Sequence, residues 1–286
     1  MPITNAITID VEDYFQVSAF EHSIDRKTWD SLEHRVARNM DRIFEIFSEN
    51  NVKATFFVLG WVAERYPEVV KKIIANGHEL ASHGYGHQRV SDMSREQFKS
   101  DIVLAKNILE DISGQAIKGY RAPSYSIGEK NIWALQILAE TGHEYSSSIY
   151  PIEHDHYGYP AAPRFVFKDE KTGLIEIPIT TMKMANRLFP AGGGGFFRFY
   201  PYFLSRWAIN RVNNQDFQPT VFYLHPWELD PGQPRQHNIS AKSRFRHYLN
   251  LDKTEERLKM LLSDFEWDRV DEVFIKNKTI KSHLLS

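Results

Sequence analysis

Acidic side chains gather at the end of the first apolar segment of this chain. Asp10, Glu12 and Asp13 lie within four residues after the run Ala6–Ile9. Carboxylates this close repel one another unless they share a cation or a proton. Successive side chains of a strand point to opposite faces, so Asp10 and Glu12 lie on one side and Asp13 on the other. The cluster is either a solvated acidic strand end or part of a site that holds a cation.

A pair of histidines follows a second short apolar segment. His83 and His87 stand four residues apart in the sequence SHGYGH, whose glycines favour a turn over a helix. Two histidines at this spacing can present their imidazoles to one metal ion. Surface histidines on a loop are the alternative for such a pair taken alone. Two histidines and one carboxylate are a ligand set of catalytic zinc sites that keep positions open for water and substrate. We therefore expect a divalent metal, zinc by this ligand set.

Two more segments place polar residues at the ends of apolar runs. Arg121, in the sequence RAPSY, could pair with a buried carboxylate and fix its orientation. A backbone N–H just after the proline of this segment could face a developing oxyanion. His225 follows the run Val221–Leu224 and could act as a general acid. Taken singly, both segments have a structural alternative, a proline turn and a partly buried histidine.

In order and spacing, these four segments resemble those of the polysaccharide deacetylases of carbohydrate esterase family 4, the NodB-like deacetylases. The most specific match is Gly77–His87 (GHELASHGYGH), a near-literal version of that family's metal-binding motif. The similarity runs from about Asn5 to about Trp267. The segments TIDVEDYF and GGGGFFRFYP are similar to a branch associated with exopolysaccharide export loci of Gram-negative bacteria. The resemblance implies metal-dependent removal of N-acetyl groups from an amino sugar in a poly- or oligosaccharide, in exopolysaccharide biosynthesis.

The resemblance also implies roles for individual residues. Asp10 falls on the catalytic base, Arg121 on the arginine that positions the base, and His225 on the general acid. His83 and His87 fall on the two metal-binding histidines.

Two residues, Glu12 and Asp13, are candidates for the acidic ligand that completes the metal site. Many members of the family have two adjacent acids, whereas here Val11 follows Asp10. Other branches use an acid two residues further on, which is Glu12, and the alternation of the strand also favours Glu12. A bulge at Val11 would break the alternation and bring Asp13 inward instead.

Four residues are predicted on the substrate side of the site. The Ser124 backbone N–H falls on the family's oxyanion donor, and Tyr125 and Trp227 are expected beside the substrate. Tyr223 stands where a leucine of the acetyl pocket usually lies. Ser146 replaces an aspartate that often tethers the general acid, which puts the tuning of His225 in question. Candidate platforms for sugar rings, with core packing as the alternative for each, are Tyr14, Tyr157, Phe197 and Trp227.

The elements that must position these residues alternate short apolar runs with amphipathic stretches, as β/α units do. Strands are expected over residues 6–11, 52–59, 79–82, 117–121, 174–177 and 220–224. Helices are expected over residues 36–47, 62–74, 94–109, 132–139, 202–212 and 254–265, and functional loops over residues 150–164 and 191–195. The pattern predicts an α/β fold, a distorted (β/α)7-type barrel in a single domain over residues 1–286, with the chemistry at the carboxyl ends of the strands.

Composition narrows the function classes. The chain of 286 residues has a formal charge of −2, which gives no electrostatic basis for binding nucleic acid. It has no cysteine, which excludes disulfides and thiol nucleophiles. No run approaches the roughly 20 apolar residues of a membrane span, and the first residues do not read as a signal peptide, so we expect a cytoplasmic bacterial protein. The expected partner is an N-acetylated glycan, and the oligomeric state is open.

Two other functions fit the same residues. An allantoinase-like amidohydrolase acting on a small ureide would share the barrel, although the aromatic loops favour a glycan. A glycan-binding protein with an inactive site is the other alternative. The presence of Asp10, Arg121, His225 and both histidines of the pair in one chain argues against an inactive site.

Overall fold

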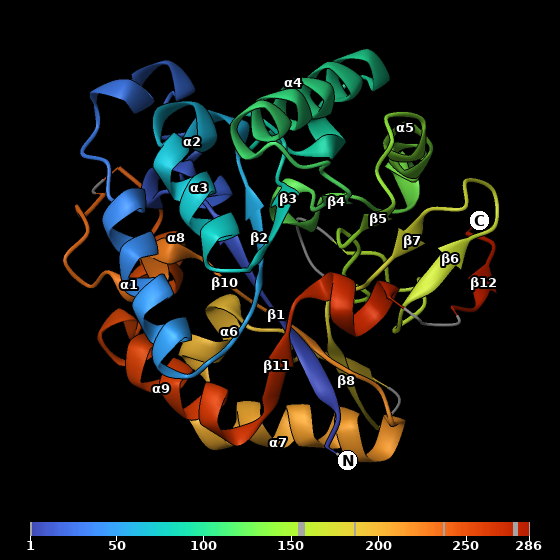
Figure 1. Cartoon of the computed structure of the whole chain (residues 1–286). Coiled ribbons are helices and arrows are strands. Elements are labelled where there is room, and N and C mark those ends of the chain that lie inside the picture. The colour runs from blue at the N-terminus through green and yellow to red at the C-terminus, as the bar shows by residue number, and fades with distance from the viewer. Residues whose placement is uncertain (1, 154–157, 186, 237, 277–279, 286) are drawn as a thin grey trace.

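Parallel strands form the centre of the computed structural model, which describes residues 2–153, 158–185, 187–236, 238–276 and 280–285. In the order β10-β1-β2-β3-β4-β5-β7, every neighbouring pair of strands is parallel. Their bounds are β1 Thr4–Val11, β2 Thr55–Val58, β3 Glu79–Ser82, β4 Gly119–Tyr120, β5 Tyr145–Ser146, β7 Ile175–Glu176 and β10 Val221–Leu224. These seven strands confirm the predicted α/β barrel, with β1 at its centre in Figure 1.

Between β7 and β10 the barrel is closed by segments outside the named strands, and not by a continuous pairing of two strands. Thr180 accepts a hydrogen bond from the Ala191 N–H at 3.1 Å, and Gly192 accepts one from the Tyr223 N–H at 2.7 Å. Gly193 forms an isolated parallel bridge with Tyr223. The closure of the barrel therefore depends on the glycine-rich segment.

Short strands extend the sheet at its margins. β6 Phe167–Asp169 pairs antiparallel with β7, β12 Ser282–His283 pairs with β6, and β11 Glu266–Asp268 pairs with the start of β1. A separate hairpin joins β8 Thr181–Met184 to β9 Arg187–Pro190.

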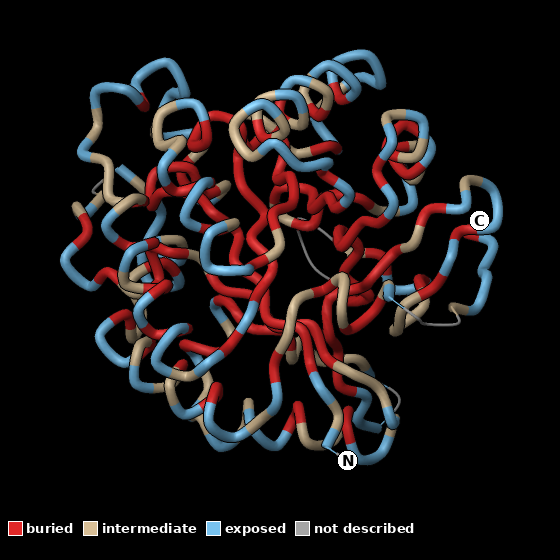
Figure 2. Tube along the Cα trace, viewed as in Figure 1, coloured by how far each residue is buried: buried red, intermediate tan, exposed pale blue. Residues whose placement is uncertain are grey.

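Helices cover the outside of the barrel and bury the faces that the sequence predicted. α1 Val36–Glu49 buries Val36, Met40, Ile43, Phe44 and Phe47, which recur at helical spacing. α4 Arg95–Ser113 begins at a capping box of Ser94 and Gln97 and buries Phe98, Ile102, Ala105 and Leu109. The remaining α-helices are α2 Gly60–Arg65, α3 Pro67–Ala75, α5 Ala134–Glu140, α6 Gly194–Phe199, α7 Tyr202–Arg211, α8 Ala241–Tyr248 and α9 Leu251–Asp264. In Figure 2 the buried residues follow the strands and the inner sides of these helices.

Two predicted elements differ from the observed ones. The single helix expected over residues 62–74 is two helices, α2 and α3, because Tyr66 leaves the helical conformation and Pro67 starts a new helix. The loop expected over residues 191–195 ends earlier, because α6 begins at Gly194 and buries Phe197. The other predicted loop, residues 150–164, contains no named element among its described residues. No helix among the described residues is long and apolar enough to span a membrane.

We predict that Gly193→Ala lowers the free energy of unfolding by at least about 2 kcal/mol. Gly193 has a φ of 116°, and an added Cβ would lie 2.2 Å from the Tyr223 carbonyl oxygen. The matched control is Gly195→Ala, where an added Cβ meets nothing within 4 Å and alanine favours α6. Urea unfolding of both variants measures the difference, and equal stabilities would contradict the closure described for the barrel.

Candidate functional site

Six side chains that the sequence singled out meet at the carboxyl ends of β1, β3, β4 and β10. They are Asp10, Glu12, His83, His87, Arg121 and His225. The first five are buried, with exposed fractions between 0% and 5%, and the side chain of His225 is 18% exposed. Parallel strands all end at the same end of a barrel, so residues far apart in the sequence share one site.

Glu12, His83 and His87 form a group with the spacing of metal ligands. One ligand atom of each lies within 4.8 Å of the ligand atoms of the other two. Glu12 Oε2 lies 2.7 Å from His87 Nε2. His83 Nδ1 lies 2.8 Å from the carbonyl oxygen of Arg121, which can only accept, so Nδ1 carries the proton and Nε2 keeps its lone pair.

Unpaired atoms and charge in this group fit a cation. Among the described residues, Glu12 Oε2 is buried against His87 Nε2, and His87 Nδ1 is buried without a hydrogen-bond partner, which is costly unless another group satisfies it. Burial alone would raise the pKa of Glu12, but the imidazoles of His87 and His225 hold the pKa of this carboxyl well below its usual range. Burial lowers the pKa of His83 to about 4, so this imidazole is neutral at neutral pH, as a metal ligand must be. The residues present therefore fit a divalent metal.

Asp13 faces away from this group and organises the chain behind it. Its carboxylate accepts hydrogen bonds from the backbone N–H groups of Tyr14 at 2.8 Å, Arg35 at 2.6 Å and Val36 at 2.9 Å. Asp13 thus caps the 3₁₀ turn that follows β1 and binds the first residues of α1. Burial raises the pKa of Asp13 to about 6, against the opposing effect of the N–H donors. The alternation of the strand, which favoured Glu12 over Asp13, matches this arrangement.

The turn that carries His87 is held by residues other than the three candidate metal ligands. His87 has a φ of 51°, in the left-handed region that favours glycine. Arg26 donates hydrogen bonds to the carbonyl oxygens of Gly86 at 2.9 Å and His87 at 3.2 Å. Asp101 accepts one from the Tyr85 N–H at 3.0 Å. These contacts hold a strained turn that places the second imidazole.

Asp10 is held by an arginine and a tyrosine. Arg121 Nη1 lies 2.6 Å from Asp10 Oδ1, which is the contact predicted from the sequence. The same guanidinium donates to Thr8 Oγ1 at 2.7 Å and to Ser147 Oγ at 2.9 Å, so it has little freedom to turn. Tyr125 donates to Asp10 Oδ2 at 3.2 Å. The carboxylate of Asp10 is thereby paired with a guanidinium and held in one orientation.

His225 lies across from these carboxylates. Its Nε2 is 3.7 Å from Glu12 Oε1 and 3.9 Å from Asp10 Oδ2. Its Nδ1 is 2.7 Å from Glu228 Oε1. Burial lowers the pKa of His225, but the carboxylates of Glu12, Glu228 and Asp10 outweigh burial and raise this pKa to about 9. The imidazole of His225 therefore keeps its proton at neutral pH.

Glu228 and Arg198 are functional neighbours that the sequence reasoning missed. Glu228 is fully buried, and its second oxygen, Oε2, lies 2.6 Å from Arg198 Nε. Ser146, which replaces the family's usual aspartate, instead donates to Ser148 Oγ at 2.7 Å. Glu228 occupies the tethering role that Ser146 leaves open. The available signal was the spacing of His225 and Glu228, three residues apart in one turn.

The predicted substrate-side residues divide into two groups. Ser124 has a φ of 55° and its hydroxyl contacts the hydroxyl of Ser18. The ring of Tyr223 lies 4.9 Å from the ring of Tyr125 and 5.7 Å from that of His225, centroid to centroid. These three predicted residues, Ser124, Tyr125 and Tyr223, border the site.

Trp227 does not fit its predicted role as a sugar platform. It is 5% exposed, its ring stacks against the imidazoles of His225 and His247, and its Nε1–H donates to Glu12 Oε1 at 3.0 Å. Trp227 therefore orients Glu12 and His225 from behind. Tyr14 and Phe197 are also not open platforms, because each is 1% exposed, and Tyr157 lies outside the described residues.

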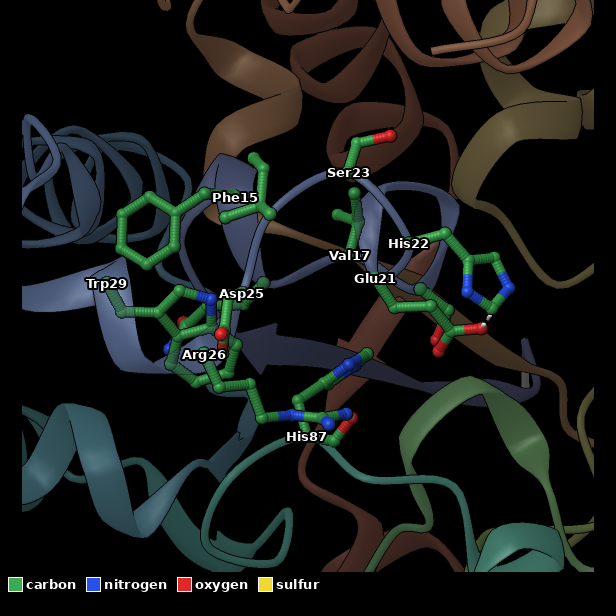
Figure 3. A pocket seen from close by; sticks show the side chains of 12 residues that line it. Phe15, Val17, Glu21, His22, Ser23, Asp25, Arg26, Trp29 and His87 are labelled. Atoms are coloured by element: carbon green, nitrogen blue, oxygen red, sulfur yellow. Dashed lines mark hydrogen bonds and ion pairs between the residues drawn. The ribbon is translucent and has the colours of Figure 1, made fainter. Parts of the chain in front are cut away.

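A cavity of about 370 Å³ is lined in part by His87, one of the three candidate metal ligands. Figure 3 shows Arg26 and His87 close together at this cavity, with Glu21 and His22 beside each other in another part of its wall. Glu21, Asp25 and Arg26 make the lining polar and of mixed charge. The cavity beside His87 has room for a polar ligand larger than an acetyl group.

Two family models match consecutive segments of the chain. Residues 26–146 match the polysaccharide deacetylase family, and residues 147–275 match a family described as a domain of unknown function, DUF3473. The boundary directly follows β5, inside the sheet. Asp10 and Glu12 precede the first segment and His225 lies in the second, so the candidate site also draws on residues outside the deacetylase segment.

Curated relatives match this chain over about a third of its length. A peptidoglycan-N-acetylglucosamine deacetylase of Bacillus cereus is 34% identical over 96 residues, which cover 33% of this chain and 35% of that protein. A chitooligosaccharide deacetylase of Azorhizobium caulinodans is 31% identical over 97 residues, which cover 34% of this chain and 43% of that protein. The chain thus spans less than half the length of these curated relatives.

Solved structures match nearly the whole chain at low identity. One described as a polysaccharide deacetylase from Mycobacterium smegmatis has a TM-score of 0.63 and 17% identity, covering 100% of this chain and 98% of that chain. The Puue allantoinase has a TM-score of 0.59 and 14% identity, covering 95% of this chain and 88% of that chain. These similarities establish the fold, and they do so for a deacetylase and an allantoinase alike.

We predict that Glu12→Ala weakens the binding of Zn²⁺ by more than about a hundredfold, because even partners outside the ligand shell are worth 10- to 100-fold. Asp13→Ala should leave the affinity within a few-fold but cost about 1–2 kcal/mol of stability, because it removes a cap. Calorimetric titration with zinc and urea unfolding of both variants make the comparison. If Asp13→Ala lost the zinc affinity and Glu12→Ala kept it, the acidic metal ligand would be Asp13 and not Glu12.

Proposed function

Starting from the NodB-like polysaccharide deacetylase segment at residues 26–146, we propose that this chain is a metal-dependent hydrolase that removes N-acetyl groups from an amino sugar of a glycan. One observation carries the proposal. A carboxylate held by an arginine, a Glu-His-His group and a tethered imidazole lie around a single point, with His225 Nε2 within 4 Å of both Asp10 and Glu12. Hydrolysis of an amide needs a base, an electrophile and an acid at such a point.

Glu12, His83 and His87 would hold the metal, which we propose to be zinc. When bound, zinc in a site of this kind activates water and polarises the acetyl carbonyl. The buried Glu12 carboxylate offers one oxygen to the Trp227 N–H and keeps the other towards the imidazoles. His83 is held in the ligating tautomer by the Arg121 carbonyl oxygen. These contacts preorganise the three ligands.

Asp10 acts as the base. It takes the proton of the water that attacks the acetyl carbon, and Arg121 holds the carboxylate in position for this step. The backbone N–H of Ser124 faces the oxygen that becomes negatively charged as the carbonyl is attacked. Tyr125 and Tyr223 border the space for the acetyl group.

His225 acts as the acid. The Glu228 carboxylate accepts a hydrogen bond from the Nδ1–H of His225, which aims Nε2 at the reacting centre. From Nε2, His225 gives a proton to the amine that departs, without which the C–N bond does not break. Glu228 touches His225 and not the substrate, so it is a positioning residue.

Both family segments contribute to this proposed machinery. The base and the metal ligands lie in or before residues 26–146, whereas His225 and Glu228 lie in residues 147–275. We therefore propose one catalytic domain over the whole chain. We further propose that the glycan belongs to an exopolysaccharide and that the protein is cytoplasmic.

The rival functions predict different products. A ureide hydrolase would act on allantoin and release no acetate from oligosaccharides, and a binding protein would release none from either. The polar cavity of about 370 Å³ beside His87 supports a glycan, because it leaves room beyond the acetyl group. An acetate-release assay on N-acetylated oligosaccharides, run beside an allantoin assay, tests the proposal.

We predict that Asp10→Asn and His225→Ala each lower kcat by about 10²–10⁴-fold. Asparagine cannot accept the proton of water, and alanine cannot donate one to the leaving amine. Acetate release at saturating zinc measures kcat, and the zinc affinity of each variant serves as the control for an intact site. A variant that binds zinc and keeps near-normal kcat would remove the role given to its residue.

We predict that Glu228→Gln lowers kcat by about tenfold or more while KM changes little. Glutamine has nearly the same shape but lacks the charge that fixes the imidazole and stabilises its protonated form. A purely structural role would instead show as a lower melting temperature with kcat unchanged in the folded fraction. Steady-state kinetics together with thermal unfolding separate the two.

A further inference from the structure

A surface formed by α7 and the hairpin of β8 and β9 carries large apolar side chains that are exposed. Phe203 is 66% exposed and Trp207 is 44% exposed, and because they stand four residues apart they share one face of α7. Met184, at the end of β8, is 42% exposed and lines the same cavity as Trp207. Large apolar side chains gathered on one surface indicate that a partner covers them.

The segment that builds this surface has charge of one sign. Residues 177–215 contain no acidic residue, although the whole chain has a formal charge of −2. The cationic residues of the segment are Lys183, Arg187, Arg198, Arg206 and Arg211. Arg198 and Arg206 pair with carboxylates, whereas the other three have no ion pair among the described residues. This concentration of cations favours a partner of negative charge.

The three cations without an ion pair lie among the exposed apolar side chains. Lys183 precedes Met184 in β8, and Arg187 is the cross-strand partner of Met184 in β9. Arg211 Nε donates to the carbonyl oxygen of Lys183 at 3.2 Å, and its guanidinium lies 5.9 Å from the ring centroid of Trp207. The α7–hairpin face is defined by these side chains together with Phe203: Lys183, Met184, Arg187, Phe203, Trp207 and Arg211.

One carboxylate lies beside these cations but is bound by another residue. Asp216 lines a cavity together with Lys183 and Arg211. Its two oxygens accept hydrogen bonds from Arg164 at 2.9 and 3.2 Å. Asp216 therefore offsets the charge of the α7–hairpin face only in small part.

Cations and exposed aromatic rings on one surface fit an anionic lipid bilayer. Tryptophan and phenylalanine insert at the level of the lipid headgroups, and lysine and arginine are attracted to anionic lipids. An apolar cavity of about 250 Å³ beside Trp207, lined also by Phe189 and Leu204, offers space for part of an acyl chain. A second copy of the chain fits less well, because a two-fold interface would bring the same cations face to face.

The α7–hairpin face lies at the end of the barrel opposite to the candidate site. Asn213, two residues after α7, donates to the side chain of Asn5 at 2.8 Å, near the start of β1, whereas the site lies beyond the end of β1. In Figure 1, α7 runs below the sheet, close to the N-terminus. A membrane that contacts this face therefore leaves the mouth of the barrel open to a glycan.

We propose that the α7–hairpin face binds the surface of an anionic lipid bilayer. Its apolar side chains enter the bilayer at the level of the headgroups, and Lys183, Arg187 and Arg211 pair with lipid phosphates. The protein then lies on the membrane through this face. The inference is independent of the proposed deacetylase function, because no residue of the face belongs to the candidate site.

Sedimentation of the full chain with lipid vesicles tests the proposal. One set of vesicles mixes phosphatidylglycerol with phosphatidylcholine, and the other contains phosphatidylcholine alone. The expected result is binding to the anionic vesicles that weakens as salt is added, with much weaker binding to the neutral ones. Trp207→Ser should weaken the binding by at least about tenfold. The double variant Lys183→Gln with Arg187→Gln should weaken it by about 25-fold, because each cation near an anionic surface is worth about fivefold.

Matched controls come from α4, which lies at the top of Figure 1 while α7 lies at the bottom. Leu104→Ser removes an apolar side chain that is 46% exposed, and Lys99→Gln removes an exposed cation. Both variants should bind the anionic vesicles within about twofold of the unchanged protein. Circular dichroism of every variant confirms that it is folded.

Quenching of tryptophan fluorescence by brominated phosphatidylglycerol places the face at the bilayer. The unchanged protein should be quenched, whereas Trp207→Phe should bind the vesicles almost as well and lose most of the quenching. Quenching that persists in Trp207→Phe would show that another surface of the protein contacts the lipid, which overturns the proposal.

Two further outcomes would also overturn the proposal. The first is a lack of binding to the anionic vesicles at low salt, or binding that neither Trp207→Ser nor the double variant changes. The second is a dimer in analytical ultracentrifugation that Trp207→Ser dissociates, without binding to vesicles, which assigns the face to a second copy of the chain.

Discussion

Buried charge at the carboxyl ends of the strands governs the construction of this site. Asp10 and Glu12 are each 2% exposed, and an ionised carboxylate in such surroundings is very costly unless it is paired. Arg121 pairs with Asp10, while His87 and the Trp227 N–H face the two oxygens of Glu12. Removing one of these partners leaves a buried carboxylate with fewer contacts to offset its burial. The proposed chemistry and the stability of the barrel mouth are therefore coupled.

The same constraint extends outward and joins the two family segments. His225 faces the carboxylates of the first strand and is tied to Glu228, which is tied to Arg198 of α6. Arg198 in turn fixes the end of α8 through the His247 and Leu249 carbonyl oxygens. A chain of paired charges thus runs from the centre of the barrel to the end of α8. Through it, residues of the segment that matches DUF3473 hold His225 beside residues of the first part of the chain.

Much of this arrangement could be predicted from sequence because it follows local periodicity. The helical face of α1 and the side of the strand shared by Asp10 and Glu12 follow from spacings of 3.6 and two residues. The partners that the sequence did not reveal depend on tertiary folding. Glu228 becomes a tether because the turn after β10 brings it back to His225, and Trp227, expected beside sugar, is covered by imidazoles. Strands as short as β5, with two residues, are too brief to show any period.

In the proposed mechanism, one cation binds between Asp10 and His225, on Glu12, His83 and His87. Anomalous X-ray diffraction at the zinc edge, from crystals grown with one equivalent of Zn²⁺, tests it most directly. The account predicts one anomalous peak bonded to a Glu12 carboxylate oxygen and to one nitrogen each of His83 and His87, at about 2.0–2.2 Å. Zinc bound elsewhere, or a peak bonded to Asp13 in place of Glu12, would contradict it.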